Sequence, residues 1–150
     1  IMSGGGRYNQ MIVNERFQPR KLAVETITSD TTLTANDSGK IIFVGKTGVD
    51  ITMPSVPEAG LNYTFILNED NATTVCKVTW HGSGEFLAGS LSTAADGTAH
   101  SGIFDGSADD VVSFATGAKQ GDMFTTVCDG TTWYVWGQST AATAITSETS

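Results

Sequence analysis

Two histidines are the first residues in this chain to test for chemistry, because imidazole binds metals and moves protons near neutral pH. The two histidines are His81 and His100. His81 could join Cys76 as a zinc ligand, but zinc sites usually need three or four ligands, and no further pair of ligands supports such a site. The chain also lacks the Gly-x-Ser-x-Gly motif that holds the serine of many hydrolases. We therefore expect exposed loop histidines, with no catalytic, metal-binding or cofactor-binding residues, in a protein that is not an enzyme.

Three loops resemble ligand-binding motifs in part. Gly45-Lys46-Thr47 is similar to the end of a phosphate loop, but strands are expected on both sides, so no helix N-terminus would face a phosphate. Residues 105–110 offer about four oxygen-bearing side chains as ligands, whereas calcium needs six to eight oxygen ligands. Residues 68–71, Asn-Glu-Asp-Asn, are most simply a turn. We interpret all three as turns or solvated loops.

The two cysteines each follow the same three residues, Thr-Thr-Val, in an apolar stretch. A pair of cysteines does not make a disulfide framework, so we expect Cys76 and Cys128 to be buried reduced thiols, with a disulfide as the alternative.

Two tryptophans make the sharpest aromatic pattern. Trp133 and Trp136 lie three positions apart in an expected strand, where neighbouring side chains alternate between faces, so one of them must point away from the core. Because few polar groups adjoin them in the sequence, the outward one fits a subunit contact better than a platform for sugars.

The segments that position these residues are predicted to be strands. Short alternating runs of β-branched and aromatic residues recur about every 8–12 residues, and Asp129-Gly130 is the strongest hairpin signal. No segment shows a helical period. We predict an all-β fold, an antiparallel β-barrel or jelly-roll-like sandwich of about ten short strands, over residues 22–138. Residues 139–150 are small and polar and are predicted to form a flexible C-terminal tail.

Composition and charge exclude several partners. The 150 residues include 16% charged residues and carry a net charge of −8. Residues 1–21 hold four basic residues and one acidic residue, a net +3, and residues 22–150 hold four lysines and fifteen acidic residues, a net −11. We expect such an acidic body not to bind nucleic acid or an anionic membrane. No apolar run approaches the roughly 18 residues of a membrane helix, and no secretory signal is visible.

Residues 1–21 are predicted to be an extended N-terminal arm that docks on a partner. The segment has no helical or alternating period, but it is too apolar for a free tail and should bury against either this body or a neighbour. Its expected docking residues are Arg7, Tyr8, Met11, Ile12, Val13, Arg16, Phe17, Arg20 and Lys21.

Residues 33–44, 50–54 and 59–65, with the closing run 121–135, carry a family resemblance. Together they resemble small β-rich structural proteins of tailed bacteriophages, especially capsid decoration (cement) proteins. The resemblance covers roughly residues 31–137 and implies a β-barrel or jelly-roll body, commonly trimeric, at three-fold or quasi-three-fold positions of the capsid. It implies no catalytic residue.

The resemblance and the charge pattern together give a functional hypothesis. The chain is expected to decorate and stabilise an assembled phage capsid by bridging neighbouring capsomers. A protein that binds only the assembled shell shifts the assembly equilibrium toward that shell. Its partners would be the major capsid protein and itself, as a homotrimer on the outer surface of the virion, after synthesis in the host cytoplasm. The alternatives are a fibre or receptor-binding β-module that recognises a host surface glycan, and a carbohydrate-active enzyme domain.

Overall fold

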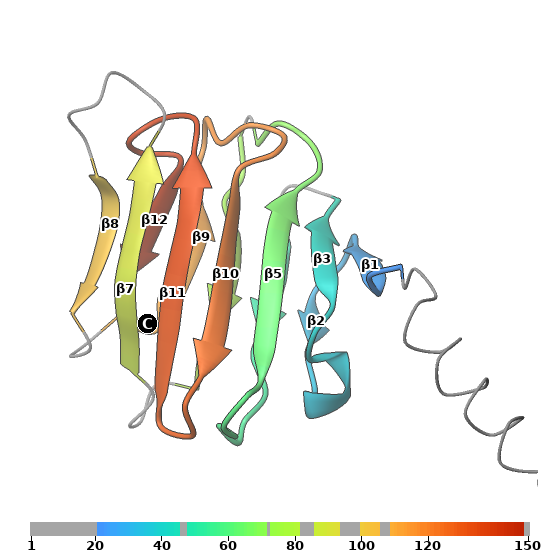
Figure 1. The fold of residues 1–150 in the computed structure, drawn as a ribbon. Coiled ribbons are helices and arrows are strands. Elements are labelled where there is room, and N and C mark those ends of the chain that lie inside the picture. The colour runs from blue at the N-terminus through green and yellow to red at the C-terminus, as the bar shows by residue number, and fades with distance from the viewer. Residues whose placement is uncertain are drawn as a thin grey trace, which may run out of the picture.

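The described part of the chain forms two β-sheets that pack face to face (Figure 1). This structure, a computed structural model, describes residues 21–45, 48–71, 73–81, 86–93, 100–105 and 109–148. One sheet contains, in spatial order, β1 (Val24–Ile27), β3 (Ile41–Val44), β5 (Asn62–Leu67), β10 (Met123–Cys128), β11 (Thr132–Ser139), β7 (Phe86–Thr93) and β8 (His100–Asp105). The other contains β12 (Ile145–Glu148), β9 (Val111–Phe114), β6 (Cys76–Thr79), β4 (Asp50–Thr52) and β2 (Thr31–Thr32). A short 3-10 helix, η1 (Ala35–Asp37), precedes β3.

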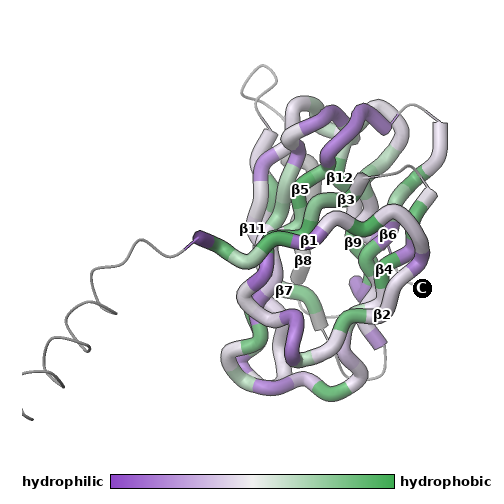
Figure 2. The backbone as a smooth tube through the Cα atoms, turned by 90° about the vertical axis from the view of Figure 1, so that its right-hand side faces the viewer, coloured by the Kyte–Doolittle hydropathy of each residue, from purple (hydrophilic) through white to green (hydrophobic). Residues whose placement is uncertain are grey.

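The first six strands alternate between the two sheets. Each of the first four pairs in parallel with the strand two places later, so that β1, β3 and β5 lie in one layer and β2, β4 and β6 in the other (Figure 2). A parallel pair needs a long crossover connection. Here a strand of the opposite sheet supplies part of each crossover, and no long helix is needed.

The all-β class is confirmed, but the prediction of antiparallel sheets is wrong for this first half. Both sheets are mixed: β5, β10 and β11 pair antiparallel, as do β6, β9 and β12, whereas β7 joins β11 in parallel. Within the described residues each sheet has two edges, β1 and β8 in one and β12 and β2 in the other, so the sheets form a sandwich and no closed barrel.

The core between the sheets is rich in aromatic rings. Strict alternation along β5 and β10 turns every second side chain inward. Phe65 and Phe124 stack at 4.9 Å between ring centroids, and Phe114 of the facing sheet lies 5.5 Å from Phe124. Trp80 meets Trp133 edge to face at 6.2 Å. Contacts of this kind join the two layers through large apolar area, which supplies most of the stability of a sandwich.

Three local predictions can be compared directly with the structure. Cys76 and Cys128 are buried free thiols, which confirms the reduced form and excludes the disulfide alternative. Asp129-Gly130 forms the turn between β10 and β11, with Gly130 at a φ of 109° that favours glycine. Trp133 is fully buried and Trp136 is 51% exposed, which confirms that only one of them belongs to the core.

The flexible tail predicted for residues 139–150 is wrong over residues 145–148. These residues form β12, which pairs antiparallel with β9, and Ile145 is buried. Ser139 is also buried, as the last residue of β11. The sequence did not predict this strand because its residues are mostly small and polar. A single apolar side chain anchors it, and its backbone hydrogen bonds are made with β9. The body therefore extends from residue 22 through residue 148.

Candidate functional site

The outward side of the seven-stranded sheet is the surface most suited to binding, and we call it the outer sheet face. Opposite the buried side chains, alternation along β5, β10 and β11 leaves half-buried or exposed residues. Strand pairing aligns the outward residues in three rows, Val24–Ile41–Thr64–Thr125–Trp136–Ser90, Thr26–Phe43–Ile66–Met123–Gln138–Ser92 and Asn62–Val127–Tyr134–Ala88. From β1 to β7 none of these residues is charged, although the whole chain carries a net charge of −8; on edge strand β8 the register places Asp105 beside Ala88.

One end of the outer sheet face is apolar and borders the arm. Leu22 and Val24 are 68% and 62% exposed at edge strand β1, and the half-buried Ile41 and Phe43 continue this apolar strip on β3. The arm joins the sheet here, at exposed Lys21, while the other expected docking residues, from Arg7 to Arg20, lie outside the described residues. Exposed apolar residues gathered at one edge mark an interaction surface.

A hollow, which we call the Trp136 hollow, lies over β10, β11 and β7 on the outer sheet face. It has a volume of about 500 Å³ and is lined by Ser90, Ser92, Met123, Thr125, Trp136, Gly137 and Gln138. The Ser92 hydroxyl donates to the Gly137 carbonyl oxygen at 3.1 Å, and the Thr125 hydroxyl lies 3.0 Å from that of Thr64. The indole of Trp136 is thus surrounded by hydroxyl, amide and thioether groups.

The expectation that few polar groups adjoin the outward tryptophan is therefore wrong. The polar lining comes from β7, β10 and β11, which are far apart in the sequence and become neighbours only through the sheet order. The one sequence signal for this site was that either Trp133 or Trp136 must point outward.

Two glycines let the strands come together around β11. Gly89 has a φ of +136°, and a Cβ there would lie 1.9 Å from the Val135 carbonyl oxygen. A Cβ on Gly137 would lie 2.3 Å from the Met123 carbonyl oxygen. Because both contacts are with backbone, a side chain at either position would push β7 or β10 away and reshape the Trp136 hollow.

Tyr134, which is 44% exposed beside the hollow, is fixed by the hairpin turn. Its hydroxyl donates to Asp129 Oδ2 at 3.2 Å, and Asp129 Oδ1 accepts from the backbone N–H groups of Thr131 and Thr132. The backbone N–H groups of Thr132 and Thr131 lower the pKa of Asp129, and its carboxylate in turn raises the pKa of Tyr134. The tyrosine hydroxyl therefore stays protonated and acts as a donor in this pair.

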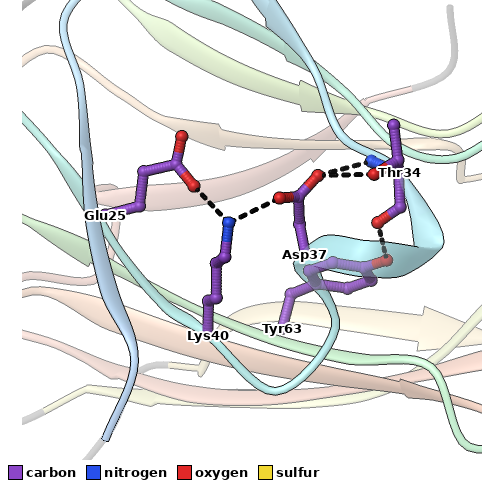
Figure 3. Close-up of polar contacts among 5 residues, drawn as sticks. All are labelled: Glu25, Thr34, Asp37, Lys40 and Tyr63. Carbon is purple, nitrogen blue, oxygen red and sulfur yellow. Dashed lines mark hydrogen bonds and ion pairs between the residues drawn. The ribbon is translucent and has the colours of Figure 1, made fainter.

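An ion-pair cluster holds edge strand β1 to β3 and η1 (Figure 3). Lys40 Nζ donates to Glu25 Oε2 at 2.8 Å and to Asp37 Oδ1 at 2.6 Å. Asp37 Oδ2 accepts from the N–H and the hydroxyl of Thr34, and the Tyr63 hydroxyl donates to the Thr34 carbonyl oxygen. Burial, followed by the charges of nearby carboxylates, raises the pKa of Tyr63 to about 12. The cluster fixes the strand from which the arm departs.

We expect Asp37→Asn to remove an acid-sensitive contribution to stability. The bonds from Lys40 and the Thr34 N–H hold the pKa of Asp37 below its usual 3.8. A carboxyl group with a lowered folded-state pKa stabilises the fold above its unfolded-state pKa, and this contribution is lost as the pH falls through the folded-state pKa. In urea unfolding, the variant should be less stable than the wild type at about pH 7, and this difference should shrink as the pH falls below 3.8. A difference that does not shrink would contradict this assignment.

The two histidines and Cys76, the residues considered as metal ligands, lie in different settings. His81 is exposed, with Nε2 3.0 Å from the Met53 carbonyl oxygen, whereas Cys76 is buried in β6. His100 begins β8 and so lies in a strand, which differs from the loop position predicted. In the described ranges, no group of three or more His, Cys, Asp or Glu side chains could hold a metal ion.

The structure describes the other loops singled out in the sequence only in part. Lys46, Thr47 and residues 106–108 lie outside the described residues, while Asp110 is buried. Asn71 is more than a turn residue, because it is fully buried and its amide donates to the Phe114 and Ala115 carbonyl oxygens. It thereby ties the loop after β5 to the end of β9.

Comparison with known proteins adds no relative. No protein-family model matches the chain, and no curated protein matches it. Over the part of the chain that the structure describes, no helix is long and apolar enough to cross a membrane.

Proposed function

We propose that this chain is a non-enzymatic structural protein that decorates an assembled phage capsid and stabilises it by bridging neighbouring capsomers. The proposal places it as a homotrimer on the outer surface of the virion, bound to the major capsid protein, after synthesis in the host cytoplasm. It includes the jelly-roll character that the family resemblance implies for the sandwich. The all-β sandwich supports this proposal, and its main support is the apolar surface beside the arm.

The carrying observation is the apolar strip beside the arm. Leu22, Val24, Ile41 and Phe43 extend the apolar surface of the sheet to the residue where the arm begins. An arm with apolar and basic residues would continue this strip onto a neighbouring subunit of the shell. Three arms in a trimer would act together, so that weak single contacts give strong binding through effective concentration.

The charge distribution supports the same proposal. The arm carries a net +3 and the remainder a net −11, so the arm is the part suited to acidic patches on a capsid. The apolar strip formed by Leu22, Val24, Ile41 and Phe43 carries no charge, so burying it in a subunit contact would avoid the cost of removing charges from water.

Removing residues 1–20 is expected to weaken binding to capsids that lack this protein by about a hundredfold or more, because the three arms bind as a unit. The measurement is co-sedimentation with the capsids, together with the temperature at which they release DNA. A full-length variant with Leu22→Ser and Val24→Ser tests the body side of the same strip and should weaken binding less. Unchanged binding and heat resistance of the truncated protein would overturn the role of the arm.

The exposed Trp136 favours one further candidate, a fibre or receptor-binding module that recognises a host surface glycan. Its location separates it from decoration. Antibody label spread evenly over virion heads in electron micrographs would support decoration, whereas label confined to the tail or one vertex would favour the receptor-binding candidate.

A further inference from the structure

We infer that the Trp136 hollow is a binding site for an uncharged sugar, with a pyranose ring stacked on the indole of Trp136. This inference does not depend on capsid decoration, and it gives the receptor-binding candidate a defined site and ligand class. The hollow combines an aromatic surface, polar groups able to reach sugar hydroxyls, and a lining without formal charge.

The stacking surface is the exposed indole. Trp136 is 51% exposed although it lies in the middle of a seven-stranded sheet, with β10 on one side and β7 on the other. An aromatic ring offers a broad apolar surface with an electron-rich face, which suits the C–H groups on one side of a pyranose. A volume of about 500 Å³ lies within the range of small-ligand sites.

The polar groups are placed around this ring. The register sets Ser90 directly beside Trp136, and Gln138 is two residues further along β11 on the same side. Both residues are exposed, and within the described residues neither side chain is engaged in a hydrogen bond. An amide and a hydroxyl both donate and accept, as sugar hydroxyls do. Thr125 and Ser92 keep acceptor capacity beyond the bonds that they already make.

The charge pattern selects the class of sugar. The seven residues that line the Trp136 hollow include no Asp, Glu, Lys or Arg, so a charged ligand would find no ion-pair partner in the lining. The net charge of −8 also repels sialic and uronic acids. Neutral hexoses and N-acetylhexosamines remain as the chemistry that this lining can match.

The test uses the full chain on an array of neutral and acidic glycans, followed by calorimetric titration with lactose, maltose, cellobiose and chitobiose. We expect binding to neutral glycans and weaker or no binding to acidic ones. Trp136→Ala should weaken binding at least about tenfold, Gln138→Ala about threefold to tenfold, and Trp136→Phe less than Trp136→Ala. Val56→Ala, in an exposed loop that does not line the hollow, is the matched control and should bind as the wild type does.

Several results would overturn the inference. These are no response to any neutral glycan, a preference for acidic glycans, or equal affinity of Trp136→Ala and the wild type. Sedimentation of the same variants adds a separate readout: if Trp136→Ala dissociates an oligomer and no glycan binds, the face is a subunit contact instead. Capsid co-sedimentation of Trp136→Ala should match the wild type, so failure of this inference and failure of the decoration proposal can be told apart.

Discussion

Trp133→Ala is expected to lower the free energy of unfolding by about 3–5 kcal/mol, whereas Trp136→Ala should change it by about 0.5 kcal/mol or less. The same substitution three positions apart on one strand thus separates core from surface. Trp133 is fully buried, with ring centroids 6.2 Å from both Tyr63 and Trp80, so truncation leaves a cavity between the two sheets.

Urea unfolding monitored by far-UV circular dichroism measures both variants without depending on tryptophan fluorescence. Trp133→Phe is the conservative control. It keeps an aromatic ring in the core and removes an indole N–H that has no hydrogen-bond partner in the described structure, so its loss should be well below that of Trp133→Ala. Equal losses for Trp133→Ala and Trp136→Ala would mean that the side chains do not alternate as β11 requires.

Local patterns predicted the strands and the faces of this protein well. A strand has a side-chain period of two, so the alternation along residues 132–136 was enough to separate Trp133 from Trp136. The turn at Asp129-Gly130 was equally local, because it depends on one glycine and one carboxylate that caps backbone N–H groups. These features depend on neighbouring residues alone.

The sheet topology could not be predicted in this way. Alternation is the same in parallel and antiparallel strands, so nothing in residues 24–27 or 41–44 shows that they pair in parallel. The direction is set by β2 and β4, which return the chain through the opposite sheet. Strand β12 was hidden for a similar reason, since its order depends on pairing with β9 more than on its own composition.

The Trp136 hollow could be predicted from the sequence only in part. The alternation showed that one of Trp133 and Trp136 points outward, but it did not show which one, and it gave no sign of the polar residues. Ser90 and Gln138 are brought together by the parallel pairing of β7 with β11, and Thr125 by the antiparallel pairing of β10 with β11. Sites built across a sheet are therefore visible in a sequence only through the member whose exposure is unusual for its type.

Asp122→Ala is expected to lower the free energy of unfolding by about 2–4 kcal/mol, because hydrogen bonds to a charged group are worth more than neutral ones. Asp122 is 1% exposed. Its Oδ1 accepts from the Thr140 N–H at 2.7 Å, and its Oδ2 accepts from the Lys119 N–H at 2.9 Å. One carboxylate thus joins the turn before β10 to the segment that leads into β12.

Two further variants test whether the buried carboxylate of Asp122 is the cause of this loss. Asp122→Asn keeps the side-chain shape and one acceptor oxygen, so one of the two backbone hydrogen bonds remains, and its loss of stability should fall below that of Asp122→Ala. Asp70→Ala removes an exposed carboxylate of the same region, which accepts from the Gln120 N–H and from Lys119, and should cost clearly less because water replaces its bonds. Urea unfolding should rank the losses as Asp122→Ala, Asp122→Asn and Asp70→Ala. If Asp70→Ala costs as much as Asp122→Ala, the buried junction does not anchor β12, and that strand is held by its pairing with β9 alone.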